Sequence, residues 1–414
     1  MWIKRVAIYI LLVSIYGFSW FIAILARILP HRRWKPTGRI IVTGTFFNPN
    51  WYLSHINPLA RSGVKEVILV VDEPYLPMDN VRFVCWPRWM SKLLSRQLAR
   101  AIWLLAAGIR YKPDFYMGYS LGPGACTALI AGKLMGRPTC YQMTGGPVEI
   151  IGGGFDTVEG FGAPLGQPSR FIEKLAIKVV KQFSLVVVRG TKAKEFLIEK
   201  KINKSVAIIT GSVNSSEKIE SNNRDIDLVF VGRISTIKQV PQFIEIIANI
   251  SKTIPDVKAA VIGEGHLLNE MKEYTIKLGV GNNIEFLGKI GNIEEILLKS
   301  KIFILTSKSE GLSIALAEAM VAGVVPVVSD IGELSDLVID GTNGYLIEPN
   351  NVNKHSEKVL SLLQNDTLWK SFSRKAIEDA KKLCDIEVVT EKWNKEIKKV
   401  VSNSSGYIKE DLQN

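Results

Sequence analysis

Residues 301–330, KIFILTSKSEGLSIALAEAMVAGVVPVVSD, decide how this 414-residue chain folds. Two β-rich apolar runs, 301–307 and 325–330, enclose the helical stretch IALAEAMVA. A strand, a helix and a second strand in this order predict a right-handed crossover in a parallel sheet. Ser313 is a candidate N-cap before the helix, and Gly323 is placed to end it.

The same alternation of strand and helix patterns extends over most of the chain, in two series. The first series predicts strands at 39–44, 66–71, 81–86, 114–118, 138–143, 184–188 and 206–210. The polar stretch 212–225 is interpreted as a linker. The second series predicts strands at 227–232, 258–263, 283–288, 301–307, 325–330 and 344–349. We therefore predict an α/β protein with two doubly wound Rossmann-like domains, over 36–211 and 226–385.

Two carboxylates, Glu310 and Glu318, lie eight positions apart in a stretch that is otherwise apolar or small. A buried carboxylate without a partner costs several kcal/mol. Arg233 and Lys238, after the strand at 227–232, are candidate partners, because side chains that follow parallel strands share one edge of the sheet. Two cations beside a helix N-terminus suit a diphosphate, and carboxylates accept hydrogen bonds from sugar hydroxyls. The pattern predicts a nucleotide-sugar site without a metal.

The segments FVGRISTIK (230–238) and SEGLSIALAEAMVAGVVPVVSD (309–330) resemble the retaining GT-B glycosyltransferases of family four, or glycosyl transferases group 1. The resemblance covers roughly residues 224–385 and implies two Rossmann-like domains that face a cleft. The catalytic residues that it implies are Arg233, Lys238 and Glu310. The donor-binding residues that it implies are Glu318, Gly311, Leu312, Ser313, Gly232, Gly265, Gly44 and Thr45.

The resemblance also implies a role for each charged residue. Arg233 and Lys238 match the pair that holds the donor diphosphate. Glu310 matches a glutamate that contacts the donor sugar, and Glu318 matches one that holds the ribose hydroxyls. Closure of the two domains would then exclude water from the transfer.

The N-terminal domain departs from the family pattern in two places. Gly44 stands alone where many members have a glycine-rich loop, and no histidine follows the strand at 138–143. The candidates for the place of that histidine, on the acceptor side, are Gln142, Thr144 and Glu149. The glycine-rich stretch 147–166 is interpreted either as an acceptor lid or as an ordinary loop. The resemblance further implies that a helix in 386–414 crosses back to the first domain before a polar tail.

Residues 6–26, VAIYILLVSIYGFSWFIAILA, are a run of 21 residues without a charge. As a helix this run would span about 31 Å, the thickness of a bilayer core. We predict a membrane anchor within residues 1–35, with an interfacial helix or a core helix as the alternatives. More basic residues follow the run than precede it, which places the long C-terminal part on the cytoplasmic side of the cell membrane.

The net charge of +12 is concentrated in residues 1–110, which hold 15 Lys+Arg and 4 Asp+Glu. A basic end predicts an anionic partner. Within the stretch 87–110, basic residues recur every fourth position beside Trp and Leu, as on one amphipathic helix: Arg88, Lys92, Arg96 and Arg100. Such helices dock on anionic membranes. The alternative is a solvated helix face with its back in the core.

We predict a membrane-associated retaining glycosyltransferase that moves a sugar from a nucleoside-diphosphate sugar to a lipid-linked or glycan acceptor. The four cysteines and four histidines are scattered, so neither a metal nor another cofactor is expected. The rival interpretations are an inactive GT-B regulatory subunit, a nucleotide-sugar epimerase and a nucleic-acid-binding protein. The presence of all four charged residues, Arg233, Lys238, Glu310 and Glu318, argues against the first. The spacing of the two glutamates and the predicted anchor argue against the second, and the apolar 21-residue run favours lipid over nucleic acid.

Overall fold

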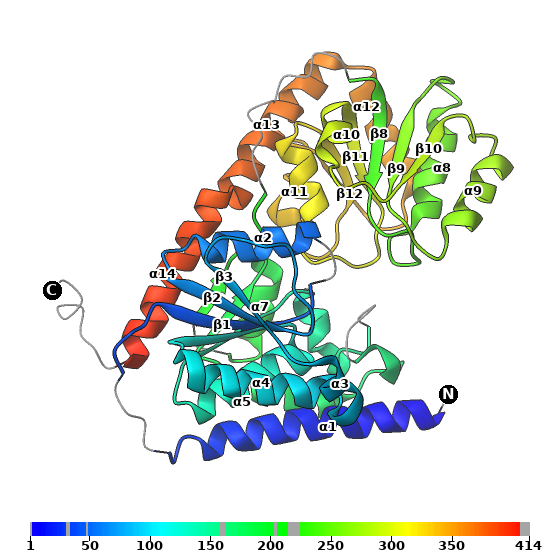
Figure 1. The fold of residues 1–414 in the computed structure, drawn as a ribbon. Helices are drawn as coiled ribbons and strands as arrows, with labels where there is room; N and C mark the ends of the chain where they lie inside the picture. The colour runs from blue at the N-terminus through cyan, green and yellow to red at the C-terminus, as the bar shows by residue number, and fades with distance from the viewer. Residues whose placement is uncertain are drawn as a thin grey trace. The chain divides into compact units, whose positions relative to one another are not determined.

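The structure is a computed structural model that describes residues 2–29, 34–46, 49–156, 162–202, 205–213 and 224–405. The chain divides into two compact units (Figure 1). Unit 1 comprises Met1–Gly211 and Val389–Asn414, and unit 2 comprises Ser212–Val388. Residues 214–223 of the predicted linker and the tail from residue 406 lie outside the described residues.

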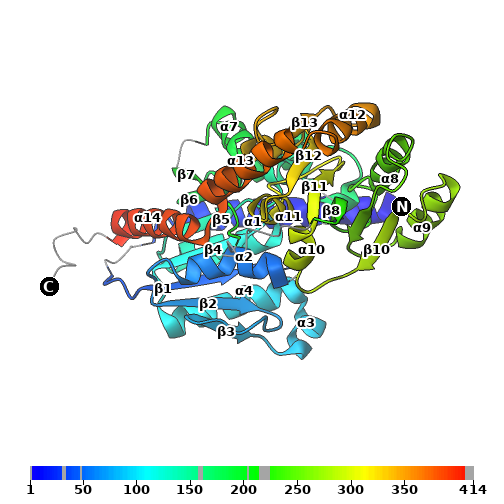
Figure 2. The same ribbon diagram turned by 90° about the horizontal axis from the view of Figure 1, so that it is seen from above.

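Unit 1 is built on a seven-stranded parallel sheet with the order β3-β2-β1-β4-β5-β6-β7 (Figure 2). Its strands are β1 (Arg39–Thr43), β2 (Glu66–Val71), β3 (Val81–Cys85), β4 (Phe115–Tyr119), β5 (Thr139–Gln142), β6 (Leu185–Val188) and β7 (Ser205–Ile208). The strand order reverses between β1 and β4. In doubly wound sheets, this switch point is where ligands bind, beyond the carboxyl ends of the strands.

Helices cover both faces of this sheet because successive strand residues point to opposite sides. On β4, Phe115, Met117 and Tyr119 face a core shared with α2 and α14, whereas Tyr116 faces a core shared with α4 and α5. The α-helices of unit 1 are α1 (Trp2–Leu25), α2 (Pro49–Ala60), α3 (Arg88–Leu94), α4 (Arg96–Tyr111), α5 (Cys126–Leu134), α6 (Arg170–Val180), α7 (Thr191–Glu199) and α14 (Ile386–Ser405). Short turns of other helix types are η1 (Leu121–Ala125), η2 (Gly146–Glu149), η3 (Ile151–Gly153) and η4 (Ala163–Leu165).

Unit 2 contains a six-stranded parallel sheet with the order β10-β9-β8-β11-β12-β13. Its strands are β8 (Ile226–Val231), β9 (Ala259–Ile262), β10 (Ile284–Gly288), β11 (Ser300–Leu305), β12 (Val325–Ser329) and β13 (Tyr345–Ile347). The switch point lies between β8 and β11. The helices are α8 (Val240–Ile250), α9 (Leu268–Lys277), α10 (Glu294–Leu298), α11 (Ile314–Val321), η5 (Leu334–Asp336), α12 (Val352–Leu363) and α13 (Asp366–Cys384). The prediction of an α/β protein with two doubly wound parallel sheets is confirmed.

Local sequence signals set several helix starts. The side chains of Ser169, Asn351 and Asn365 each accept a hydrogen bond from a backbone N–H in the first turn of α6, α12 and α13. These caps satisfy donors that a helix leaves unpaired. The last helix, α14, begins in unit 2, and its residue Trp393 is buried in the core of unit 1.

Helix α1 is long and apolar enough to cross a membrane, over Lys4–Leu25. It packs against α5 and α6, outside the helix layer that covers the sheet (Figure 1). Leu12, Tyr16 and Ala23 are buried in the same core cluster as Leu129 of α5 and Val179 of α6. One stripe of the predicted anchor is therefore part of the core of unit 1, while the opposite face exposes large apolar side chains.

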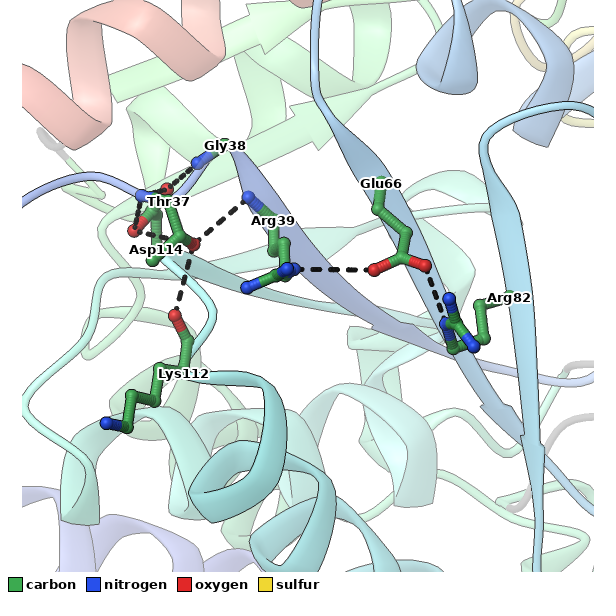
Figure 3. A network of polar contacts seen from close by, with 7 residues as sticks. All are labelled: Thr37, Gly38, Arg39, Glu66, Arg82, Lys112 and Asp114. Atoms are coloured by element: carbon green, nitrogen blue, oxygen red, sulfur yellow. Dashed lines mark hydrogen bonds and ion pairs between the residues drawn. The ribbon is translucent and has the colours of Figure 1, made fainter.

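A network of charged and polar groups lies at the amino ends of the strands in unit 1, away from the switch point (Figure 3). The Asp114 carboxylate accepts hydrogen bonds from the backbone N–H groups of Thr37 and Gly38, at 2.8 and 2.7 Å. Burial raises the pKa of Asp114 despite these donors. Beside it, Glu66 forms an ion pair with Arg82 at 2.6 Å. The network fixes the entry into β1 and has a structural role.

The prediction that Arg88, Lys92, Arg96 and Arg100 form a stripe on one helix is wrong. The helix breaks between α3 and α4 at Ser95, which has a φ of 78°. Arg96 binds Asp72 at 2.5 Å, Arg88 binds Glu73 at 2.8 Å, and the buried Arg100 lies over the Trp86 ring. Two of the four cations, Arg88 and Arg96, are therefore paired with the carboxylates that follow β2.

Candidate functional site

The carboxyl edge of unit 2 brings together loops that follow neighbouring strands. Gly232, Arg233 and Lys238 follow β8, and Glu310 follows β11. Since β8 and β11 pair across the switch point, these two loops meet where doubly wound sheets bind ligands. Backbone contacts hold the loops together, because the Lys308 N–H donates to the Ile237 carbonyl at 2.8 Å.

Lys238 and Glu310 form an ion pair at this point. The Lys238 Nζ lies 2.5 Å from Glu310 Oε1, and the Ser307 hydroxyl donates to the same oxygen at 2.5 Å. The side chains of Lys238 and Glu310 are only 21% and 11% exposed. The sequence raised the question of what compensates Glu310, and the answer is a cation from the neighbouring loop. Ser307 was not predicted as a site residue, because it was assigned to the end of the strand at 301–307, whereas β11 ends at Leu305.

Glycines allow two flanking loops to approach the backbone of the loops after β8 and β11 closely. A Cβ on Gly265 would lie 2.0 Å from the Ile234 carbonyl oxygen, in the loop after β8. A Cβ on Gly332, which has a φ of +51°, would lie 1.9 Å from the Glu310 carbonyl oxygen. Any side chain at either position would displace the backbone that carries Arg233 or Glu310. Gly265 was predicted as a donor-side residue, whereas Gly332 was missed because it precedes no recognised motif.

The loop after Glu310 leads directly into α11. Gly311 is half-buried, Leu312 is buried in the core, and Ser313 caps the helix by accepting a hydrogen bond from the Leu316 N–H at 3.3 Å. The predicted N-cap is confirmed. The N-terminus of α11 thus lies a few residues from Glu310, and its partial positive charge favours an anion in the same region.

Glu318 lies in the second turn of α11 and differs from Glu310. Among the described residues, no hydrogen bond or ion pair reaches its carboxylate. Burial raises the pKa of Glu318 to about 7. A half-buried acceptor without a protein partner is chemically suited to ligand hydroxyls, which agrees with its predicted role. Arg233, by contrast, is exposed beside Gly232.

The carboxyl edge of unit 1 is organised by Glu149. Its Oε1 accepts hydrogen bonds from the N–H groups of Thr144 and Gly145, at 2.7 and 2.5 Å, and from the Thr144 hydroxyl at 2.9 Å. Its Oε2 accepts from the Tyr141 hydroxyl at 2.7 Å and the Leu121 N–H at 3.0 Å. The carboxylate therefore ties the loop after β4 to the loop after β5.

The other predicted residues of this edge are buried or half-buried. Gln142 is fully buried, and its amide has no hydrogen bond within the described part of the chain. The Thr144 hydroxyl lies 2.8 Å from that of Ser120. A Cβ on Gly44 would lie 2.8 Å from the Cβ of Tyr119, so glycine lets the chain pass beside β4. Thr45 follows it and is half-buried.

His55 of α2 is a buried group of this edge that was not predicted. Its ring centroid lies 5.7 Å from that of Tyr119, and burial together with the charge of Arg189 holds its pKa well below the usual range. No local motif marks this histidine, because it reaches the sheet through the packing of α2. Of the glycine-rich stretch 147–166, residues 157–161 lie outside the described residues, while Ile150 and Leu165 are buried in the core.

The structure thus brings together Lys238 and Glu310, and places Arg233, Gly232, Gly265, Gly311 and Ser313 in the surrounding loops of unit 2. Arg88, Lys92, Arg96 and Arg100 lie in unit 1, on α3 and α4. Among the described residues, no three His, Cys, Asp or Glu side chains are grouped so that they could hold a metal ion. Metal independence stays a prediction.

Comparisons with known proteins agree with this geometry. Residues 212–382 match the family described as glycosyl transferases group 1. The chain is 30% identical over 164 residues to the poly(ribitol-phosphate) alpha-N-acetylglucosaminyltransferase of Staphylococcus aureus, a match that covers 39% of this chain and 33% of the relative. It is 28% identical over 205 residues to a GalNAc-alpha-(1->4)-GalNAc-alpha-(1->3)-diNAcBac-PP-undecaprenol alpha-1,4-N-acetyl-D-galactosaminyltransferase of Campylobacter jejuni, covering 48% of this chain and 55% of the relative. The chain therefore spans between a third and just over half of the length of these relatives.

The fold has solved counterparts. The structure of Anabaena HepE in complex with UDP-glucose superposes with a TM-score of 0.69 at 16% identity, over 87% of this chain and 99% of that one. At this identity the likeness concerns the fold, in both units. The chain has the two-domain GT-B fold, and its residues 212–382 are similar to the glycosyl transferases group 1.

Proposed function

We propose that the protein is a membrane-associated, metal-independent retaining glycosyltransferase that uses a nucleoside-diphosphate sugar. The observation that carries this proposal is the ion pair of Lys238 and Glu310 at the switch point of unit 2. Arg233 in the same loop and the N-terminus of α11 after Ser313 add positive charge. Two cations and a helix N-terminus suit a diphosphate, and two carboxylates suit the hydroxyls of a sugar and a ribose.

The proposed chemistry follows from where charge develops. When the glycosidic bond breaks, the diphosphate takes the bonding electrons and gains negative charge, which Arg233, Lys238 and the N-terminus of α11 stabilise. The acceptor oxygen forms the new bond on the same face of the sugar. Its proton passes to the departing phosphate, so no protein base is required. Glu310 orients the donor sugar, and Glu318 holds the ribose.

The proposed acceptor is a glycan or a lipid-linked glycan at the cytoplasmic face of the cell membrane, in the synthesis of an envelope polysaccharide or glycolipid. The name of the Campylobacter relative includes an undecaprenol-linked acceptor, and that of the Staphylococcus relative a ribitol-phosphate polymer. The exposed apolar surface of α1 supports a site of action at a membrane.

The test is binding and turnover of UDP-, GDP- and ADP-sugars by the purified full chain in EDTA. Arg233→Ala and Glu310→Ala are compared with Lys277→Ala, a matched change at an exposed lysine of α9. We expect one donor to bind and turn over, and the first two variants to lose about 10²–10³ in rate while the control does not.

A second interpretation is a catalytically inactive GT-B subunit that binds a donor and regulates a partner. This interpretation predicts that the donor binds but that no sugar is transferred to any acceptor tested. Turnover that requires an added divalent ion would contradict metal independence, and equal rates in all three variants would contradict the assigned site.

A further inference from the structure

Helix α1 has two distinct long faces. Its buried stripe, which includes Leu12, Tyr16 and Ala23, packs against α5 and α6. The opposite face exposes large apolar side chains along the whole helix: Ile10, Leu11, Phe18, Phe21, Ile24 and Leu25. In water this face is unfavourable, because contiguous exposed apolar patches of this kind are rare on soluble monomers.

The two ends of α1 are also tied to unit 1. The Arg5 guanidinium lies against Gly166, and the Arg27 Nη2 donates to the Gln182 Oε1 at 2.6 Å. A helix that spanned a bilayer would have to leave the core and break both contacts. The packing therefore fits a helix that lies along the unit and presents one side outward.

A second apolar stripe lies on α4 and the preceding α3. Helix α4 packs on the sheet through Ala99, Leu104 and Ala107, so its opposite side points away from the sheet. That side and the preceding α3 expose Trp89, Leu93, Leu98, Ile102 and Ile109. Helix α4 contacts α5, which α1 also contacts, so the two stripes belong to one side of unit 1 (Figure 1).

The helices on this side of unit 1 also carry more basic than acidic residues. Helices α1, α3, α4, α5 and α6 together carry 11 Lys+Arg and one acidic residue, Glu173, which binds Lys200 at 2.8 Å. The neighbouring α7 adds 2 Lys and 2 Glu, and Arg88 and Arg96 are paired with Glu73 and Asp72. The opposite side has no such excess, since α2 and α14 carry 4 Lys and 3 Glu. Apolar stripes with a surplus of cations over anions complement an anionic lipid surface.

We propose that unit 1 docks on an anionic bilayer through the outward faces of α1, α3 and α4, with α1 in the plane of the membrane. The protein would then be monotopic, with both ends of α1 on the side of the catalytic units. This inference rests on the membrane association in the proposed function and specifies its geometry. Its tests use no donor, so it can fail while the transferase assignment stands.

The first test is flotation of the full chain with vesicles of phosphatidylcholine alone or with added phosphatidylglycerol. We expect binding to the anionic vesicles that weakens in high salt. The double variant Phe18→Ser/Phe21→Ser should bind at least about tenfold more weakly. Ile276→Ser, at an exposed residue of α9 in unit 2, is the matched control and should bind like wild type. Absence of binding, or equal binding of both variants, would overturn the proposal.

The second test separates an in-plane helix from a spanning one. Trp2→Cys and Ile28→Cys are made in a Cys85→Ser background, since the other cysteines are buried. Ile276→Cys marks the side of the catalytic units. In sealed membrane vesicles from expressing cells, a membrane-impermeant maleimide should label all three from the same side. Labelling of Trp2→Cys from the opposite side would show a spanning helix and contradict the in-plane arrangement.

Discussion

At the switch point of unit 2, the loops after β8 and β11 are joined by the ion pair of Lys238 and Glu310. At the switch point of unit 1, the loop after β4 is held by Glu149, whose carboxylate accepts hydrogen bonds from neutral N–H and hydroxyl groups. Both edges have the same topology. The difference teaches that the same topology can be closed by an ion pair or by a carboxylate with neutral donors. The ion pair of unit 2 supports the proposal that the anionic donor binds there.

The largest effect that would test this comparison is expected for Lys238→Met. Loss of a fixed cation that stabilises the leaving diphosphate should lower donor turnover by about 10²–10³, or roughly 3–4 kcal/mol. Lys277→Met on α9 is the matched control. Initial rates with the preferred donor, measured at saturation, check the prediction.

A second variant separates chemistry from folding. Lys238→Met leaves the Glu310 carboxylate without its cation and lowers the free energy of unfolding. Lys238→Met/Glu310→Gln removes both charges and should recover stability but not turnover. Turnover that recovers together with stability would mean that the ion pair is only structural.

The second effect concerns Glu318, whose pKa burial raises from 4.5 to about 7. In the folded chain the carboxyl stays protonated in a pH range where the unfolded chain has released the proton. The free energy of unfolding should therefore fall by on the order of 3 kcal/mol as the pH rises from about 4.5 to about 7.

The free energy of unfolding of unit 2 is measured in urea at several pH values, with pulse proteolysis as the readout of the unfolded fraction. Glu318→Gln should lack this contribution, so the difference between wild type and variant should change across the stated range. Parallel pH profiles of the two proteins would contradict the assigned burial of Glu318.

The fold and the core of the unit 2 site were predictable because both depend on local order in the sequence. Strand and helix patterns alternate, and Arg233, Lys238, Glu310 and Glu318 stand at fixed places relative to them. Ser307 and Gly332 were missed because their importance depends on which loops meet in space.

Unit 1 was less predictable for a related reason. The regular spacing of Arg88 and Arg100 indicated one helix. Nothing in that spacing revealed the break at Ser95 or the ion pair of Asp72 with Arg96. The apolar run of α1 was evident from composition alone. Its buried stripe depends on α5 and α6, which lie more than a hundred residues along the chain from its start.

The third effect concerns Glu149 in unit 1. Glu149→Ala leaves the N–H groups of Leu121, Thr144 and Gly145 without their acceptor, and should lower the free energy of unfolding by about 1–3 kcal/mol. Glu195→Ala, at an exposed glutamate of α7, should change it little. Chemical denaturation of the two variants checks this. Equal stabilities would mean that water replaces Glu149 without loss.

The smallest effect is expected on the outward side of unit 1. Lys92 is exposed on α3, and among the described residues no ion pair reaches it. Lys92→Gln should weaken binding to anionic vesicles by about fivefold, because each cation near such a surface contributes about 1 kcal/mol. Lys252→Gln in unit 2 should leave vesicle binding unchanged, and both proteins should unfold at the same temperature. A larger loss for Lys252→Gln would place the membrane surface on unit 2.

The path of α14 has a consequence for synthesis on the ribosome. Val389, Trp393, Ile397 and Val400 complete the core of unit 1 from a helix that begins in unit 2. These residues are translated only after unit 2, so unit 2 can fold while unit 1 still lacks part of its interior. During that interval the nascent unit 1 exposes apolar surface, to which chaperones or membrane lipids can bind.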